Sequence, residues 1–276
     1  MLDFKRKGWS RGSSPWLLDE PANTQDFWAL RYFGAAFHEG INRANGPAKL
    51  AFRVDISRPQ WQRDIFDGLL DYNVVGGAMR EYHRIVLDRK AAEGQVVVEY
   101  GSSNAIEGSN MQAVGWCLDS WSLGVDGVLP WQTIGRAESW TTADPLSLFY
   151  PSRDGGEPSP SIRLKAYRRG QQDVEYLTLL AQLGGEPRWA IARRVREALH
   201  LAGERRTSGG EDAGQIQFTR LRTQDEWKLR LQVGEALSAR HPAPKRQLVE
   251  LRTPRRDLSR LAPGYVSGAE PTEPRQ

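Results

Sequence analysis

Residues Gln95–Tyr100 (QVVVEY) decide the fold class of this 276-residue chain. Three consecutive valines with no polar residue between them are typical of a strand that is buried on both faces, as strands of parallel sheets are. Gly94 precedes this run and Gly101-Ser102-Ser103-Asn104 follows it, so turn residues stand at both ends. We therefore expect a strand of a parallel sheet here, with a loop at its carboxyl end.

Similar short apolar runs lie on both sides of this strand and alternate with amphipathic patterns. The alternation predicts parallel strands that are covered by helices, and its regular repetition favours a (β/α) barrel over a doubly wound sheet. No G-x-G-x-x-G or P-loop fingerprint follows any strand, which argues against a dinucleotide or P-loop fold. The expected strands are 15–18, 50–56, 68–75, 95–100 and 126–131, and the helices between them are 25–43, 79–93 and 110–123.

Five strands are fewer than the eight of a closed TIM-type barrel. The simplest interpretation is an incomplete (β/α)8 barrel that keeps the C-terminal five βα units. The alternatives are a divergent protein that closes its sheet otherwise and an open half-barrel completed by a second copy. An open edge of parallel strands would have a cost in stability in either case.

Beyond the last strand the pattern becomes helical. We expect helices over 160–181, 187–203 and 224–240, with Ser159 or Ser161 as the cap of the first, and a polar, glycine-rich linker over 204–214. The expected domains are a partial barrel over 1–203, carrying the catalytic site, and a basic, partly disordered extension with one helix over 204–276.

Composition and charge exclude several classes of function. Residues 1–200 carry 24 Lys and Arg and 24 Asp and Glu, whereas residues 201–276 carry 14 and 10, so the net charge of +4 lies in the last quarter. A basic nucleic-acid groove across the folded body is therefore unsupported. The single cysteine, Cys117, excludes an intrachain disulfide and a cysteine-rich metal site. No apolar run approaches the length of a membrane helix, no secretory signal begins the chain, and no cofactor is expected.

Asp19 and Glu20 are the first candidates for chemistry. Pro21 ends the strand before it and should hold Glu20 in an extended conformation. Two carboxylates at the carboxyl end of a barrel strand can supply a general acid and an electrostatic partner. The alternative is that the acids merely complement the dipole of the helix that follows.

Four segments give a more specific signal: W-L-L-D-E-P at 16–21, G-V-D-G-V-L-P-W at 124–131, D-P-L-S-L-F-Y-P at 144–151 and P-S-I-R-L-K-A-Y-R-R-G-Q-Q-D-V-E-Y-L at 160–177. In order and spacing they resemble the catalytic domain of glycoside hydrolase family 123, also described as DUF4091, over roughly residues 14–182. Arg169 and Gln172 depart from the family's pattern, since an acid is usual at both positions.

The resemblance implies hydrolysis of β-linked N-acetylgalactosaminides with retention, in which the 2-acetamido group of the substrate acts as nucleophile. Such enzymes are exceptions to the scheme with a carboxylate nucleophile. Glu20 would then be the general acid/base, and Asp19 would orient the acetamido nitrogen. The implied partner is a carbohydrate, with no nucleic acid or membrane. The compartment stays open, although the family is typically secreted or periplasmic in bacteria.

Four further residues at or near strand ends are candidates for substrate binding. The Tyr100 hydroxyl could donate to the acetamido carbonyl or serve packing, and Glu99 could face the barrel interior or form a structural ion pair. Trp131 and Trp140 are candidate stacking surfaces for a sugar ring. The competing interpretations of the whole chain are a non-catalytic carbohydrate-binding or structural barrel and a nucleic-acid-associated protein that acts through its basic tail.

Overall fold

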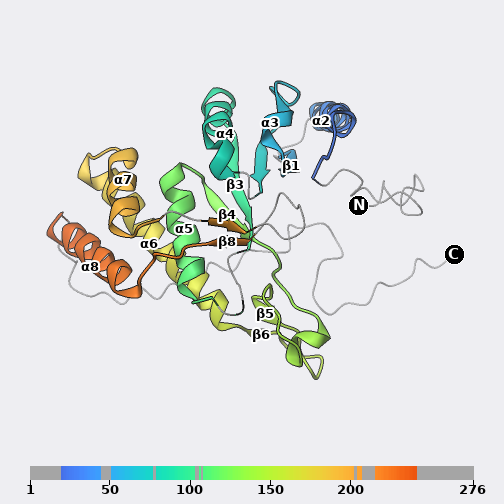
Figure 1. Cartoon of the computed structure of the whole chain (residues 1–276). Coiled ribbons are helices and arrows are strands. Elements are labelled where there is room, and N and C mark those ends of the chain that lie inside the picture. The colour runs from blue at the N-terminus through green and yellow to red at the C-terminus, as the bar shows by residue number, and fades with distance from the viewer. Residues whose placement is uncertain are drawn as a thin grey trace. The chain divides into compact units, whose positions relative to one another are not determined.

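The computed structural model describes residues 20–44, 51–76, 79–102, 106, 108–201, 204–206 and 215–240. Within them the centre is a four-stranded parallel sheet in the order β1-β2-β3-β4 (Figure 1). The strands are β1 (Arg53–Ile56), β2 (Tyr72–Val75), β3 (Val96–Gly101) and β4 (Gly127–Pro130). They overlap four of the five expected strands, although β1 begins at 53 and β2 only at 72, and the expected strand 15–18 lies outside the described residues.

Helices α2 (Thr24–Ala44), α3 (Pro59–Gln62), α4 (Met79–Glu93) and α5 (Met111–Leu123) alternate with these strands. Because the strands follow one another in chain order and βα crossovers are right-handed, the intervening helices lie on one face of the sheet. A doubly wound sheet would reverse its strand order at a switch point, and no reversal occurs among the described strands.

Side chains that alternate along the strands separate the two faces of the sheet. Val75 and Val97 pack with Met79 and Val86 of α4. On the opposite face, Val74, Val98 and Tyr100 form a small buried cluster of their own. The valine runs are therefore apolar on both faces, as the sequence predicts for parallel strands.

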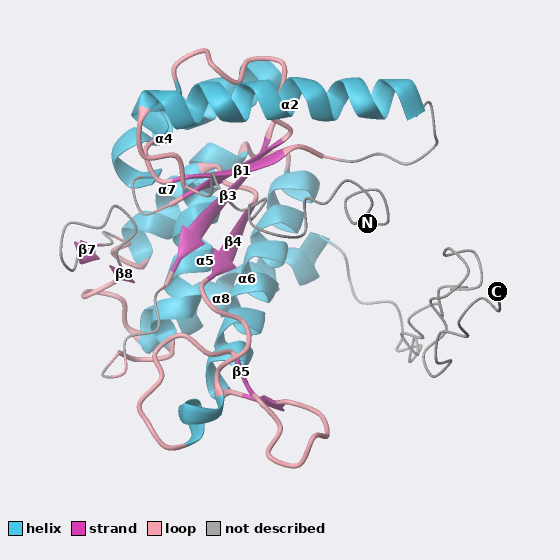
Figure 2. Ribbon diagram, turned by 90° about the vertical axis from the view of Figure 1, so that its right-hand side faces the viewer, coloured by secondary structure: helices cyan, strands magenta, loops and turns pink. Residues whose placement is uncertain are grey.

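Helix α2 lies beside β1, at one edge of the sheet (Figures 1 and 2). Its cap is Asn23, whose Oδ1 accepts hydrogen bonds from the N–H groups of Gln25 and Asp26. Phe27 packs in a cluster with Val54 and Ile56 of β1. Gly34 is required where the helix meets Phe52, since a Cβ there would lie 2.7 Å from the ring.

The chain after β4 forms a loop and a second helical layer. The loop contains η1 (Ala137–Trp140) and the short antiparallel pair β5 (Phe149–Tyr150) and β6 (Ser159–Pro160). Helices α6 (Ile162–Gly184), α7 (Arg188–Ala198) and α8 (Thr223–Arg240) pack around α5 and form the largest hydrophobic cluster. Ser161 caps α6 by accepting a hydrogen bond from the Leu164 N–H, as expected.

Two expectations about residues 204–240 need correction. The expected linker 204–214 does not begin at Glu204, because β7 (Glu204–Arg206) pairs antiparallel with β8 (Gln215–Gln217), and residues 207–214 lie outside the described residues. A boundary after residue 203 also does not separate this region from the body. Ile216, Phe218 and Val233 are buried in the same cluster as α5, α6 and α7, so the compact unit continues to Arg240.

Candidate functional site

The carboxyl ends of the four parallel strands bring together a small set of polar and aromatic side chains. Ser57 follows β1, Gly76 follows β2, Tyr100 lies near the end of β3 and Trp131 follows β4. Because parallel strands end at the same edge, these positions are neighbours although they are far apart in the sequence. Only Tyr100 and Trp131 of this set are predicted as site residues from the sequence.

Tyr100 and Ser57 are joined by a hydrogen bond. The two hydroxyl oxygens lie 2.8 Å apart, and both side chains are buried. Since β2 separates β1 from β3, this contact spans the middle strand. A tyrosine hydroxyl can accept a hydrogen bond from Ser57 and donate its own proton to a ligand.

Gly76 makes room for this arrangement. A Cβ at residue 76 would lie 3.0 Å from Cε1 of the Tyr100 ring. A side chain at that position would press on the ring, so Gly76 leaves the ring room to cross the end of β2.

Trp131 is the exposed aromatic residue of this edge, with 57% of its surface accessible. Its backbone N–H donates a hydrogen bond of 2.8 Å to the carbonyl of Gly101, which ties it to the end of β3. An indole fixed at its backbone and open on its face can stack on a sugar ring.

Helix α2, which Glu20 precedes, has its amino end at the carboxyl end of β1. Phe37 and His38, in the second half of α2, contact Phe52, which precedes β1, whereas Phe27 in the first turn packs with Ile56 at the end of β1. The helix thus runs antiparallel to β1, and its amino end points to the carboxyl end of that strand. Asp19, the other predicted carboxylate, lies outside the described residues.

The backbone of Glu20 corrects the expectation of an extended conformation. Its φ angle is +54°, in the left-handed region. A non-glycine residue there is strained, and the following Pro21 adds a steric restriction of its own. Strain of this kind is concentrated at functional sites in proteins.

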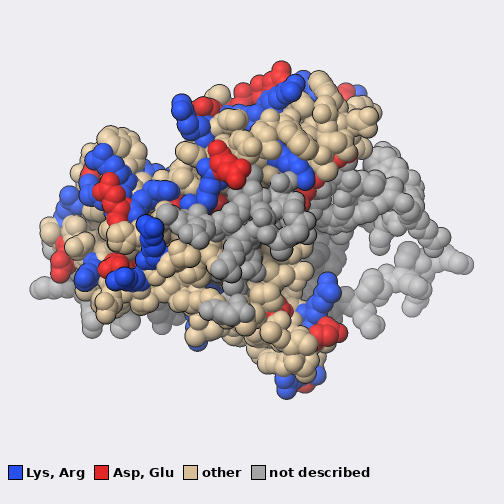
Figure 3. Space-filling view, viewed as in Figure 1, with Lys and Arg blue, Asp and Glu red and all other residues tan. Residues whose placement is uncertain are grey.

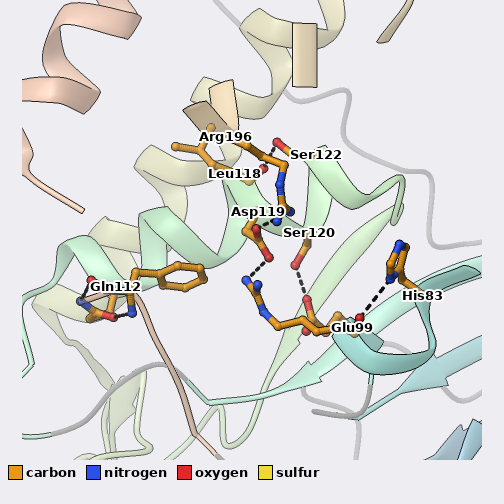
Figure 4. A network of polar contacts seen from close by, with 10 residues as sticks. His83, Glu99, Gln112, Leu118, Asp119, Ser120, Ser122 and Arg196 are labelled. Atoms are coloured by element: carbon orange, nitrogen blue, oxygen red, sulfur yellow. Dashed lines mark hydrogen bonds and ion pairs between the residues drawn. The ribbon is translucent and has the colours of Figure 1, made fainter. Parts of the chain in front are cut away.

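Glu99 lies on the opposite face of the sheet from Tyr100. Its side chain is fully buried, and Oε2 accepts a hydrogen bond of 2.5 Å from the Ser120 hydroxyl on α5 (Figure 4). Burial raises the pKa of Glu99 to about 7, although the Ser120 hydrogen bond opposes the rise. The nearby Trp116 indole also lowers this pKa without reaching hydrogen-bond geometry, and Oε1 has no hydrogen-bond partner among the described residues. Glu99 thus lies between β3 and α5, and it forms no ion pair in the described part of the chain.

Asp119, beside Ser120, is the centre of a buried ion-pair network that sequence reasoning missed. Its carboxylate is fully buried and pairs with Arg80 of α4 and with Arg196 of α7, at 2.8 Å in the second case (Figure 4). Burial raises the pKa of Asp119, and the two guanidinium groups oppose that rise. The sequence signal that could have indicated this network is the single acid within the apolar stretch A-V-G-W-C-L-D-S-W of α5.

Trp140 lies in the loop after β4 and is held by its neighbours. Its Nε1 donates a hydrogen bond of 2.8 Å to the carbonyl of Pro151. Its ring stacks on Tyr150 at 5.0 Å, with the Arg153 guanidinium 4.3 Å from the ring centroid. These contacts cover much of the indole surface. Trp140 therefore lies within the loop and not at the end of a strand of the parallel sheet.

Asp144 organises the same loop. Its carboxylate accepts hydrogen bonds from the hydroxyls of Ser139 and Ser147 and from the backbone N–H groups of Leu146 and Ser147. Burial alone would raise its pKa, but these donors hold the pKa of Asp144 at about 2.

Two of the motif segments contact each other directly. Arg163 donates a hydrogen bond of 2.6 Å to the carbonyl of Asp144, and the Ser161 N–H donates one of 2.8 Å to the carbonyl of Leu148. These hydrogen bonds join the segments 144–151 and 160–177 and hold the loop after β4 in place. Arg169, one of the departures from the pattern, pairs with Glu226 of α8.

A contact between residues far apart in the sequence, Gln112 and Phe218, could not be predicted from the sequence. Gln112, in the first turn of α5, exchanges two hydrogen bonds with the backbone of Phe218, of 2.6 Å and 3.1 Å. The residues after β8 are thereby fixed at the amino end of α5, which adjoins the strand-end edge.

The described residues contain neither a metal-binding cluster nor a membrane-spanning helix. No group of three or more His, Cys, Asp or Glu side chains converges to hold a metal ion within the described ranges. The helices in the same part of the chain include none that is long and apolar enough to span a bilayer.

Comparison with known proteins gives similarity to solved structures alone. No family model matches the chain, and no curated protein matches it. Among solved structures, it is similar to a family 123 glycoside hydrolase from Clostridium perfringens, whose structural analysis concerned glycolipid glycan hydrolysis. The TM-score is 0.44 at 14% sequence identity, over 71% of this chain and 36% of that one. The chain thus spans about a third of that structure, and a TM-score below 0.5 does not establish a shared fold.

Proposed function

We propose that this chain is a glycoside hydrolase that acts on β-linked 2-acetamido sugars of the N-acetylgalactosaminide type. The observation that carries the proposal is the strand-end edge, where Tyr100 and Ser57 are joined across β2 and the exposed Trp131 lies at the end of β4. The antiparallel course of α2 along β1 supports a position of Glu20 near this edge. The four sequence segments that resemble family 123 provide independent support.

In this proposal the four parallel strands belong to a (β/α) barrel, and the strand ends form part of its mouth. Active sites of such barrels lie at the carboxyl ends of the strands, where several strands each contribute a residue. Sequential strand order with helices on one face is the arrangement that a barrel requires.

The roles of Glu20 and Asp19 are those that the resemblance to family 123 implies, and the roles of Tyr100 and Trp131 are inferred from their places at strand ends. Glu20 protonates the glycosidic oxygen as the bond breaks, and its carboxylate then removes a proton from the attacking water. The acetamido oxygen of the substrate attacks the anomeric carbon, and Asp19 orients the acetamido nitrogen. Tyr100 donates a hydrogen bond to the acetamido group, and Trp131 stacks on the sugar ring.

Substrate specificity tests this proposal directly. The full chain should release the aryl group from an aryl β-N-acetylgalactosaminide and should not turn over the matching aryl β-galactoside, which lacks the 2-acetamido nucleophile. Equal turnover of both substrates would contradict substrate assistance. Binding of the acetamido sugar with no hydrolysis would favour the non-catalytic carbohydrate-binding alternative.

A further inference from the structure

A basic groove lies on the helical layer, away from the strand-end edge. It is an open hollow of about 500 Å³ and is lined mainly by α7 and the residues just after it, together with Arg220, which precedes α8. Figure 3 shows Lys and Arg side chains gathered on the part of the surface that carries α7 and α8. The volume lies in the range of small-molecule sites, about 300–1,000 Å³.

Three guanidinium groups contribute to the lining, from Arg193, Arg196 and Arg220. Arg196 pairs with the buried Asp119, so its charge is partly compensated. Arg193 and Arg220 form no ion pair within the described part of the chain. The acid in the lining is Glu197, so the groove keeps an excess of positive charge. Guanidinium groups match the oxygens of phosphate and sulfate esters through paired N–H donors.

Trp189 adds a flat apolar surface to the same groove. Its side chain is 67% exposed, and the Arg193 guanidinium lies 6.0 Å from the centroid of its ring. An exposed indole beside arginines binds a ring by stacking while the arginines bind an attached anionic group.

We propose that this groove binds a ring-bearing phosphate or sulfate ester, either a nucleotide or an acidic sugar. The ring stacks on Trp189, and Arg193 and Arg220 bind the ester oxygens. Glu197 opposes the anion and limits its affinity. The site is independent of the proposed hydrolase activity, since no residue of the strand-end edge lines it.

Calorimetric titration of the full chain at low ionic strength tests the proposal, with AMP, N-acetylgalactosamine 6-sulfate and inorganic phosphate as probes. At least one of the two ring-bearing probes should bind about tenfold more tightly than inorganic phosphate. Tight binding of AMP alone identifies a nucleotide, and tight binding of the sulfated sugar alone identifies an acidic sugar.

Variants separate the contributions. The double variant Arg193→Ala/Arg220→Ala should weaken binding of the tight probe about tenfold or more, whereas Glu197→Gln should strengthen it. Trp189→Ala should reduce the ring-bearing probe to the affinity of inorganic phosphate. The matched control is Arg194→Ala, on the same helix, because Arg194 pairs with Glu186 and does not line the groove.

Two outcomes would overturn the proposal. One is the absence of binding by both ring-bearing probes up to about 10 mM. The other is binding that the double arginine variant and Trp189→Ala both leave unchanged. Since the titrations measure binding and not turnover, neither result depends on whether the chain is a hydrolase.

Discussion

The hydroxyl of Tyr100 on β3 lies 2.8 Å from the hydroxyl of Ser57 after β1, so the two residues bridge the sheet above Gly76. Removing one hydroxyl with Tyr100→Phe breaks this bridge and leaves the buried Ser57 with one partner fewer. The stability loss should be about 0.5–1.5 kcal/mol. If Tyr100 also binds the acetamido group, kcat/KM should fall by a larger factor than the smaller fraction of folded protein accounts for. Denaturant unfolding and steady-state kinetics on the same samples measure both effects.

Ser57→Ala is the control for this comparison, because it breaks the same bridge but keeps the phenol. Equal losses of kcat/KM in Tyr100→Phe and Ser57→Ala would show that the tyrosine acts only through the bridge.

Gly170 sits where α6 crosses α5. A Cβ there would lie 2.9 Å from both Cβ and Sγ of Cys117 and 3.1 Å from the backbone of Val114. Gly170→Ala should therefore destabilise the protein by about 1–3 kcal/mol, despite the better helix propensity of alanine. The matched control is Gly234→Ala in α8, where nothing lies within 4 Å of the added methyl group. That variant should be neutral or slightly more stable, and equal thermal unfolding of both variants would contradict a close contact between α5 and α6 at Gly170.

Asp119 bridges three helices from a fully buried position. Asp119→Asn removes the charge but leaves Arg80 and Arg196 facing the site. Breaking a buried ion pair on one side typically costs about 3–5 kcal/mol. The comparison is Glu186→Gln, which breaks the more exposed pair with Arg194 and should cost far less stability, because solvent screens that pair. Chemical denaturation should rank the two variants in this order, and similar losses would argue against a central role for Asp119.

Asp173 on α6 carries a pH-dependent contribution to stability. Burial, followed by the neighbouring Glu226 carboxyl, raises the pKa of Asp173 to about 7, although Arg230 opposes the rise. An unfolded aspartate titrates near 3.9, so between about pH 4 and 7 the folded state holds more protons than the unfolded state. Stability should therefore fall as pH rises through this window.

Asp173→Asn should flatten that decline, as measured by unfolding at a series of pH values. Part of the slope should persist, because the pKa of Glu99 is also raised to about 7. The exposed Glu235 on the same helix as Glu226 provides the control, and Glu235→Gln should leave the profile unchanged. An unaltered slope in Asp173→Asn would contradict the assignment.

Many elements of the fold are predictable from the sequence because they depend on local residue patterns. Apolar valine runs predicted β2 and β3, and an amphipathic pattern predicted α2. On α2, Gly34 is buried and Phe33 is exposed, because the Phe52 ring leaves no room for a side chain at residue 34. This difference depends on a partner from outside the helix and cannot be read from periodicity.

The features that the sequence did not predict depend on contacts between residues that are far apart in the chain. The Gln112–Phe218 contact joins residues 106 positions apart, and the β7–β8 pair formed in a segment whose glycines suggested a linker. In the candidate site, Tyr100 and Trp131 were predictable as residues at strand ends. Ser57 was not, because its role depends on the phenol that crosses β2 to reach it.

Glu20 is the centre of the functional proposal, since it is assigned the proton transfer in both steps. Glu20→Gln keeps the size of the side chain but cannot donate or accept that proton. Glu39→Gln is the matched control, because Glu39 is an exposed acid on α2 that pairs only with Arg43 among the described residues.

The most direct measurement is kcat/KM for an aryl β-N-acetylgalactosaminide with the wild-type chain and these two variants. We predict a loss of about 100-fold or more in Glu20→Gln and wild-type activity in Glu39→Gln. Wild-type activity in Glu20→Gln would contradict the proposed mechanism.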